Sequence, residues 1–408
     1  MAVTKEILAL AVEIGDALLR NGAEVYRVED TVMHILEAYE IENYDVYVLS
    51  NGIFASANED REDACSMIRH IPLGTTHLGR IAALNQLSRE ICSHECSLID
   101  AWNRLERCKN ISFGKPVVHI FFCGLGCGCF SYLFGGTALD SIVGFFIGML
   151  LQVFLFALKR HKNSKFITNI LGSAFVTLLS LIVLSFGTPI LYDKVIIGDI
   201  MPLVPGIALT TSIRDFFNGD YLSGAIHMID AILTALYRRR CRHRHYDLSF
   251  CYGRGCAVMI IQFIVSLFAT LSFAELFGAP KKELFFCGLT GAIGWVVYVI
   301  GLNSNMGTVL ANLTATFALT VFSRILSAIR RNPVTVYLIA GIFPLVPGAG
   351  IYYTSYYFIM NDMTQFSNYG METIKVAGAI VLGIVFGFGL PQSWFNALQR
   401  IERKKTAL

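Results

Sequence analysis

The sequence predicts an α-helical integral membrane protein with about ten transmembrane helices, arranged as two inverted five-helix repeats after a small α+β cytosolic domain. Three observations support this fold class. Hydrophobic residues make up 54% of the 408 residues and charged residues only 15%, so lipid must solvate part of the chain. Residues 1–115 contain 11 basic and 18 acidic residues, whereas residues 116–408 contain 22 and 12, so an acidic part precedes a basic one. A Pro-Leu-Val-Pro-Gly segment occurs twice, 142 residues apart.

The first domain, residues 1–114, shows local patterns of both helices and strands. Apolar residues recur at helical spacing in its first part, and β-favouring residues alternate on both sides of the hairpin signal Asn51-Gly52. The predicted elements are helices over residues 7–19 and 25–39, strands over residues 45–50, 53–57 and 65–71, and one or two helices over residues 78–107.

This domain is predicted to stay in the cytosol and to bind no nucleic acid. Acidic residues interrupt the apolar start of the chain, so a signal peptide is not expected. A phosphate backbone requires a cationic face, which an acidic domain lacks. We interpret His77 and His94 as exposed polar residues, and the eleven cysteines, which lack zinc-like spacing, as free thiols. No metal site is therefore predicted.

Ten apolar runs of membrane length follow Pro116. They cover residues 117–134, 138–158, 166–186, 195–213, 221–237, 256–277, 284–302, 308–329, 334–358 and 373–395. Basic residues gather in alternate connections, so the positive-inside rule places these connections and both termini in the cytosol. Arg324 and Arg330 are assigned to one of these cytosolic connections. The connections at residues 188–194, 303–307 and 361–371 are predicted to lie outside.

One segment breaks the charge rule. Arg238-Arg239-Arg240-Cys241-Arg242-His243-Arg244-His245 falls on the outer side, directly after a span of minimal length. A lipid-binding or nucleic-acid-binding patch at that place has little physical support, so we interpret residues 238–256 as an anomalous basic segment that arose from a slip of reading frame. The predicted division is a first repeat over residues 115–237, a second over 257–400 and a basic cytosolic tail over 401–408.

The duplicated segments, Pro202 to Gly206 and Pro344 to Gly348, lie inside predicted spans. Two prolines remove two backbone donors and glycine permits an unwound conformation, so each segment predicts a broken helix. In hydrocarbon such backbone is tolerated where it is buried in protein or lines an aqueous cavity, which favours a ligand site. Because each copy has five spans, an odd number, the second copy must be inverted, as in many secondary transporters.

Polar residues follow both breaks, and their hydroxyl groups suit a small zwitterion or acid. The predicted substrate-binding residues are Pro202, Pro205, Gly206, Thr210, Thr211, Arg214, Asp215, Pro344, Pro347, Gly348, Tyr352 and Thr354. Arg214 is equally consistent with a cytosolic anchor paired with Asp215. Asp230 and His227 share one face of the fifth span, where an ionisable residue is costly unless it serves a pathway, so they are predicted to couple transport to protons. A packing role is the alternative.

Catalysis has no positive signal in the chain. A G-x-S-x-G elbow, an H-E-x-x-H pair and a Walker A loop are all missing from the sequence. We therefore predict neither an enzyme nor a cofactor. Gly124-x-x-x-Gly128, Gly144-x-x-x-Gly148 and Gly383-x-x-x-Gly387 indicate close helix packing rather than phosphate loops.

Taken together, several motifs resemble the threonine/serine exporter family. These are Gly22-Ala23-Glu24-Val25-Tyr26-Arg27-Val28-Glu29-Asp30-Thr31, the two Pro-Leu-Val-Pro-Gly segments, Ile213-Arg214-Asp215 and Gly219-Asp220-Tyr221-Leu222-Ser223-Gly224. The resemblance implies a cytosolic domain followed by ten spans, in a multi-pass protein of the cell inner membrane, and proton-driven export of small hydroxy amino acids. Some relatives of the family are thought to export dicarboxylates. The apolar sequence that the family continues is interrupted here at residues 237–256.

We therefore expect a secondary active exporter of threonine or serine, driven by the proton motive force. A succinate-like dicarboxylate is the alternative substrate, and a non-transporting membrane receptor or scaffold is the alternative of another class. The expected partners are the small-molecule substrate, protons, the lipid bilayer and a second copy in a homo-oligomer.

Overall fold

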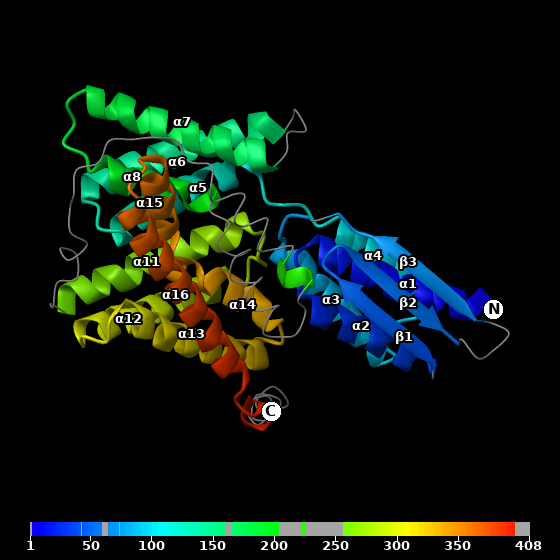
Figure 1. Ribbon diagram of the computed structural model, residues 1–408. Helices are drawn as coiled ribbons and strands as arrows, with labels where there is room; N and C mark the ends of the chain where they lie inside the picture. Colours follow the sequence, from blue (N-terminus) through cyan, green and yellow to red (C-terminus); the bar gives the residue numbers. More distant parts are fainter. Residues whose placement is uncertain are drawn as a thin grey trace. The chain divides into compact units, whose positions relative to one another are not determined.

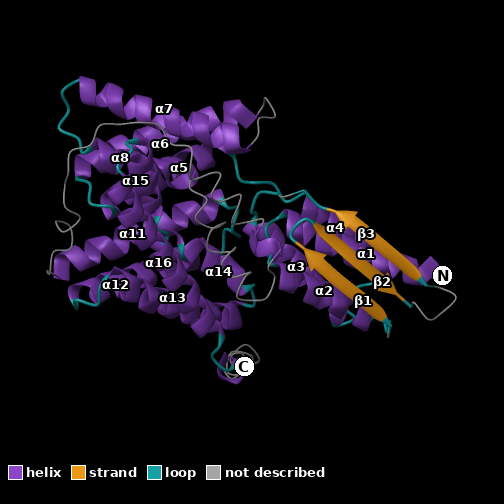
Figure 2. Cartoon of the chain, in the orientation of Figure 1, coloured by secondary structure: helices purple, strands orange, loops and turns teal. Residues whose placement is uncertain are grey.

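The computed structural model describes residues 2–41, 43–58, 64–72, 74–159, 165–203, 222–225 and 256–395. The chain divides into two compact units. The N-terminal unit contains Met1–Phe113, Asp215–Ile226 and Phe277–Pro280, and the helical unit contains Gly114–Arg214, His227–Leu276 and Lys281–Leu408. Figures 1 and 2 show the strands in the first unit and helices in the second.

The N-terminal unit is an α+β structure, as predicted. Its elements are α1 (Ala2–Arg20), α2 (Val25–Ala38), β1 (Tyr44–Leu49), β2 (Gly52–Ala57), β3 (Cys65–His70), α3 (Leu78–Cys92) and α4 (Leu98–Lys109). The strands form an antiparallel sheet in the order β1-β2-β3, with Leu49 opposite Gly52 at the hairpin. Apolar periodicity and the Asn51-Gly52 turn therefore located these elements to within a few residues.

His77 is buried rather than exposed, which corrects the prediction from sequence. Its side chain is 1% exposed, its Nδ1 accepts a hydrogen bond from the Arg80 backbone N–H at 3.3 Å, and its ring lies 4.3 Å from that of Phe113. Since the N–H donors at the start of α3 have no partner inside the helix, a side chain that caps them is held at this end. His77 is thus the N-cap of α3.

The helical unit contains seven described helices that are long and apolar enough to cross a membrane. They are α5 (Pro116–Leu133), α6 (Ala138–Lys159), α7 (Lys165–Ser185), α11 (Cys256–Leu276), α12 (Leu284–Asn303), α13 (Thr308–Arg330) and α16 (Met363–Phe388). A bent pair formed by Val334–Leu345 and Gly348–Ile359 makes up to eight. Most of the predicted fifth span and about half of the fourth lie outside the described residues, and the count of ten stays a prediction.

One face of α6 exposes a stripe of apolar residues. Ile142, Phe146, Leu150 and Val153 are each between 48% and 59% exposed and recur every three or four residues, so they share one face of the helix. An exposed apolar stripe of this length is unfavourable in water and is the expected outer surface of a helix in lipid.

Small residues bring the spans close together, as predicted from the glycine spacing. A Cβ atom on Gly124 would lie 2.5 Å from the Phe145 carbonyl oxygen, and one on Gly383 would lie 2.7 Å from that of Leu313. The predicted role of these glycines in helix packing is confirmed, because any side chain at either position would push the paired helices apart.

The sequence repeat recurs in the secondary structure. In the first copy, α8 (Tyr192–Ile200) leads into the short helix η1 (Met201–Leu203), and in the second, α14 (Val334–Gly341) leads towards η3 (Phe343–Leu345). The starts of α8 and α14, and both ends of η1 and η3, differ by 142 residues, the displacement of the two Pro-Leu-Val-Pro-Gly segments. The inversion of one copy relative to the other stays a prediction.

Candidate functional site

The second Pro-Leu-Val-Pro-Gly segment breaks its helix, as predicted. The helix before it and α15 (Gly348–Ile359) after it differ in direction by 49°. Pro344 and Pro347 have no N–H to donate, and the Gly348 N–H turns back to the Val346 carbonyl oxygen at 2.7 Å. Pro347 lies at φ −74° and ψ 54°, which with this hydrogen bond forms an inverse γ-turn. The chain therefore leaves one helix and starts another within a few residues.

The first segment is described only as far as Leu203. Pro202 lies in η1, directly after α8, at the position that Pro344 occupies in η3. The other predicted site residues of the first copy lie outside the described residues: Pro205, Gly206, Thr210, Thr211, Arg214, Asp215, His227 and Asp230.

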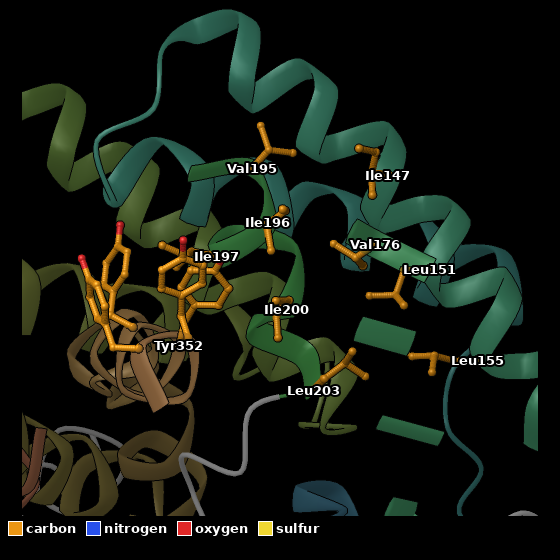
Figure 3. Packing of buried hydrophobic residues seen from close by; sticks show 13 residues of the cluster. Ile147, Leu151, Leu155, Val176, Val195, Ile196, Ile197, Ile200, Leu203 and Tyr352 are labelled. Carbon is orange, nitrogen blue, oxygen red and sulfur yellow. The ribbon is translucent and has the colours of Figure 1, made fainter. Parts of the chain in front are cut away.

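Segments of the two copies meet where α15 packs against α8. Four tyrosines of α15 belong to one buried apolar cluster with the apolar side chains of α8, as Figure 3 shows for Tyr352 and its neighbours. The tyrosines are Tyr352, Tyr353, Tyr356 and Tyr357, and the cluster members from α8 are Val195, Ile196, Ile197 and Ile200. The helix that follows the second break therefore lies beside the helix that precedes the first.

Charged groups are buried at the same contact. Asp193 and Lys194, in the first turn of α8, are 5% and 6% exposed, and the Lys194 Nζ lies 3.6 Å from the Asp193 Oδ2. The Tyr353 hydroxyl donates to that oxygen at 3.4 Å. A phenol from one copy and a carboxylate from the other thus share a hydrogen bond inside the protein.

Tyr352 and Thr354, the predicted site residues on α15, differ in their surroundings. Tyr352 is buried, with its ring 5.4 Å from that of Tyr353. The Thr354 hydroxyl donates to the Gly350 carbonyl oxygen of its own helix at 2.7 Å. Tyr352 therefore belongs to the contact between α8 and α15, whereas the described hydroxyl bond of Thr354 stays within α15.

Asp199 occupies the last turn of α8, three residues before Pro202. Its side chain is fully buried, and neither carboxyl oxygen has a hydrogen-bond partner within the described part of the chain. Its own carbonyl oxygen accepts a weak hydrogen bond from the Cys127 thiol of α5 at 3.9 Å. A Cβ atom on Gly144 of α6 would lie 3.5 Å from its Oδ1. The carboxyl group is thus enclosed between α5, α6 and α8.

In each copy, one acidic side chain and its hydrogen bonds hold the start of the fourth helix. Asp140, at the start of α6, accepts from the Leu191 N–H at 2.8 Å, and Leu191 is the N-cap of α8. In the second copy, Glu283 accepts two hydrogen bonds from Arg330, at 2.6 and 2.9 Å, and one from the Tyr337 hydroxyl of α14 at 2.6 Å. Each copy therefore uses an acidic side chain near the start of its second helix to position the half-helix before the break.

Comparison with models of protein families identifies the family of this chain. A model described as a putative threonine/serine exporter matches residues 9–237, which is more than half of the chain, and a second threonine/serine exporter model matches residues 262–388. The chain belongs to the threonine/serine exporter family. The family consists of transporters, and with its apolar helices the chain is a multi-pass membrane protein.

Curated relatives agree with this assignment. A probable threonine/serine exporter of Mycobacterium tuberculosis is 22% identical over 93% of this chain and 76% of its own, and a threonine/serine exporter of Corynebacterium glutamicum is 22% identical over 93% and 81%. A probable succinate transporter subunit, YjjP, of Klebsiella aerogenes is 22% identical over 57% of this chain and 90% of its own. No solved structure matches.

The family resemblance in the N-terminal unit rests on residues that fix the start of α2. Glu24, the N-cap, lies 2.7 Å from the Arg27 guanidinium, and the Glu29 carboxylate accepts from the Val48 N–H of β1 at 3.2 Å. Burial lowers the pKa of Arg27, but Glu24 and Tyr26 outweigh burial, so the net pKa lies above its ordinary value. In this member of the family the signature holds α2 against the sheet.

Sequence reasoning missed the buried charges of α8. It began the fourth span at Val195 and assigned Lys194 to an outer connection, whereas Lys194 is buried in the first turn of the helix. The error arose because a search for apolar runs ends at a charged residue. Here the neighbouring Asp193 carboxylate makes the buried Lys194 charge tolerable. Asp193 and Asp199 were visible signals, since an acidic residue in or beside a membrane span is costly unless it has a role.

Proposed function

We propose that this exporter-family protein is a secondary active exporter of small hydroxy amino acids, threonine and serine first, driven by the proton motive force. Its family membership and the names of its relatives from Mycobacterium and Corynebacterium support this substrate class. The hydroxyl and charged groups around the breaks suit a zwitterion of this size. The likeness to the Klebsiella succinate transporter subunit supports a dicarboxylate as the second candidate.

The observation that supports the location of the site is the break between α14 and α15, with α15 packed on α8. A broken helix leaves backbone carbonyl and N–H groups without partners in the helix, and such groups bind ligands in many transporters. We place the substrate between the two Pro-Leu-Val-Pro-Gly segments, in contact with Tyr352 and the residues that follow Gly206 in the first copy. Arg214 and Asp215 are the charged groups proposed for that half.

The proposed arrangement has ten spans in two inverted repeats, with both termini in the cytoplasm and the N-terminal domain in the cytosol. Asp230 and His227 are the proton-coupling residues proposed from sequence. Residues 115–237 and 257–400 are the proposed repeats, and the basic segment between them is the proposed site of a reading-frame slip. Translation of the underlying DNA in the other two frames tests that slip directly, because an apolar span in one frame supports it.

Transport into inside-out vesicles under an imposed pH gradient tests the function. Threonine, serine and succinate are compared as radiolabelled substrates, and the preferred substrate is expected to accumulate only with the gradient. Absence of gradient-driven flux for all three refutes the exporter and favours a receptor or scaffold.

The proline variants Pro205→Ala and Pro347→Ala test the site. Alanine restores the missing N–H and permits a continuous helix, so both variants are expected to lose transport. Pro116→Ala is the matched control, because Pro116 lies at the start of α5, where its missing N–H leaves no hydrogen bond unmade. Transport that survives both substitutions removes the broken helices from the mechanism.

A further inference from the structure

Asp199 stands apart from three other buried acids of the helical unit, Asp140, Asp193 and Glu283. Asp140 and Glu283 each accept hydrogen bonds to both carboxyl oxygens, and Asp193 has Lys194 and Tyr353 beside it. Within the described residues, Asp199 is the acid with both oxygens buried and neither hydrogen-bonded. Packing requirements alone do not explain an acid here, because they are met more cheaply by an asparagine or an apolar side chain.

An ionised carboxylate at this position is unfavourable for two reasons. Moving an unpaired charge out of water into a protein interior costs several kcal/mol even after relaxation, by the general order of magnitude for buried ions. The C-terminal end of α8 also carries partial negative charge, which repels a carboxylate in its last turn. Both penalties disappear when the carboxyl group binds a proton.

The described groups that face Asp199 do not supply a countercharge. From α5 these are the thiols of Cys123 and Cys127, and from α6 the contact is Gly144, which has no side chain. On α15, the Tyr353 phenol bonds Asp193 instead. The other titratable residues of the helices around it are His119, Cys129 and Tyr132 of α5, Asp140 and Lys159 at the two ends of α6, Lys165 at the start of α7, and Tyr192, Asp193 and Lys194 at the opposite end of α8. Lys194 lies five residues from Asp199, and its described ion pair is with Asp193.

We propose that Asp199 is the proton-binding carboxyl group of the export cycle, an inference that rests on the proposed function. In the described conformation it holds a proton. When α8 moves relative to α5 and α6 and water reaches the group, the carboxyl O–H bond breaks, the proton passes to water, and a carboxylate remains. Reprotonation from the opposite side of the membrane completes the cycle, with no change in oxidation state.

The location couples this group to the substrate site. Asp199 lies in the last turn of α8, which leads directly into η1 and Pro202, so a movement of the first break displaces α8 and the enclosure around the carboxyl group. Gly341, the equivalent of Asp199 in the second copy, has no room for such a group, because a Cβ atom there would lie 2.7 Å from Thr290 Cγ2. Of these two equivalent positions, only Asp199 in the first copy has a side chain that can bind a proton.

The full-length protein in proteoliposomes tests the proposal with two measurements. One is net transport of serine driven by a pH gradient, and the other is exchange of labelled for unlabelled serine at equal pH on both sides. Asp199→Asn keeps the size and neutrality of the protonated acid but never releases a proton. An inward proton gradient drives export only if protons and serine move in opposite directions, so serine is carried by the deprotonated form. Asp199→Asn is therefore expected to lose both net gradient-driven transport and serine exchange, and wild-type exchange is expected to decline at acid pH. Threonine or succinate replaces serine if the wild type prefers it.

Two further variants complete the design. Asp362→Asn is the matched control, because Asp362 is an exposed N-cap of α16 and asparagine caps a helix equally well. Both of its activities are expected to stay at wild-type level. Asp230→Asn tests the sequence-based alternative: if it loses transport and exchange while Asp199→Asn transports normally, the coupling proton is at Asp230 and the proposal is wrong.

Each remaining outcome also supports or overturns the proposal. Normal gradient-driven transport by Asp199→Asn overturns the proposal, as does serine exchange at the wild-type rate by this variant. If Asp199→Asn does not fold, Asp199→Glu decides: a shifted pH profile of exchange supports the proposal, and an unchanged profile overturns it. A wild-type protein that neither transports nor exchanges any of the three substrates refutes the proposed function itself, whatever Asp199 does.

Discussion

Removing the charge of Glu283 is expected to weaken the connection between α12, α13 and α14. The Glu283 side chain is 6% exposed and accepts three short hydrogen bonds, two from Arg330 and one from Tyr337. Glu283→Gln keeps the shape, so it leaves no cavity, but it replaces one acceptor by a donor that faces the guanidinium. The perturbation therefore isolates the charge and the hydrogen bonds.

The expected loss of stability depends on how far Glu283 and Arg330 are exposed to water. Breaking a fully buried ion pair costs about 3–5 kcal/mol. Arg330 is 31% exposed and its charge is partly hydrated without Glu283, so the loss is smaller, about 2–3 kcal/mol in line with hydrogen bonds to charged groups. Tyr337→Phe removes one of the three bonds and is expected to cost about 1 kcal/mol.

Unfolding in mixed micelles with increasing SDS measures these free energies. The double variant Glu283→Gln/Tyr337→Phe completes a cycle in which bonded residues show a coupling of about 0.5–3 kcal/mol. Glu372→Gln, on an exposed position of α16, is the control and is expected to change stability by less than about 0.5 kcal/mol. Additive effects within about 0.5 kcal/mol refute the reasoning, because the hydrogen bond would then contribute nothing.

Three further substitutions have expected effects on the same unfolding measurement. Arg324→Gln removes charged donors from carbonyl groups at the end of α16, which lie 2.8–3.1 Å away, and is expected to cost about 2–4 kcal/mol, of which Arg324→Lys recovers only part. Gly22→Ala is expected to cost more than Gly187→Ala: both residues have positive φ, which alone costs about 1–2 kcal/mol, but only at Gly22 does the new Cβ approach another atom, at 2.8 Å. Gly198→Val is expected to cost about 1–3 kcal/mol or more, since its Cβ would lie 2.5 Å from a backbone nitrogen of α5. Equal losses for the two alanine variants, or none for the valine, contradict these packing arguments.

Local signals in the sequence were enough to locate the second break and the strands of the N-terminal unit. Pro344 and Pro347 remove hydrogen bonds whatever surrounds them, so the break between α14 and α15 is a property of the segment itself. The hairpin at Asn51-Gly52 is local in the same sense. The repeat added a longer-range constraint, because a break observed in one copy predicts an equivalent place in the other.

Properties that depend on distant neighbours were not predictable in this way. Arg324 was assigned to a cytosolic connection, but it lies within α13, is 6% exposed and caps the end of α16. His77 and Lys194 were also placed in exposed surroundings. In all three cases the side chain binds a buried group or a helix end, which a search for apolar runs does not detect. Each of these polar residues was therefore predicted to be exposed.

The two copies of the repeat have diverged in chemistry around a shared backbone. Asp193 and Asp199 of α8 correspond by the 142-residue displacement to Thr335 and Gly341 of α14, so the charged groups of this half-helix belong to the first copy. After the break, Tyr352 and Tyr353 of the second copy correspond to two threonines in the first. Since α15 packs on α8, the Asp193 carboxylate of one copy and the Tyr353 phenol of the other meet at one contact. A symmetric pair of half-sites presents the same groups twice, whereas this pair separates a charge-bearing half from a neutral hydrogen-bonding half. Such a division suits the proposed exporter, in which a proton and a zwitterion move in opposite directions.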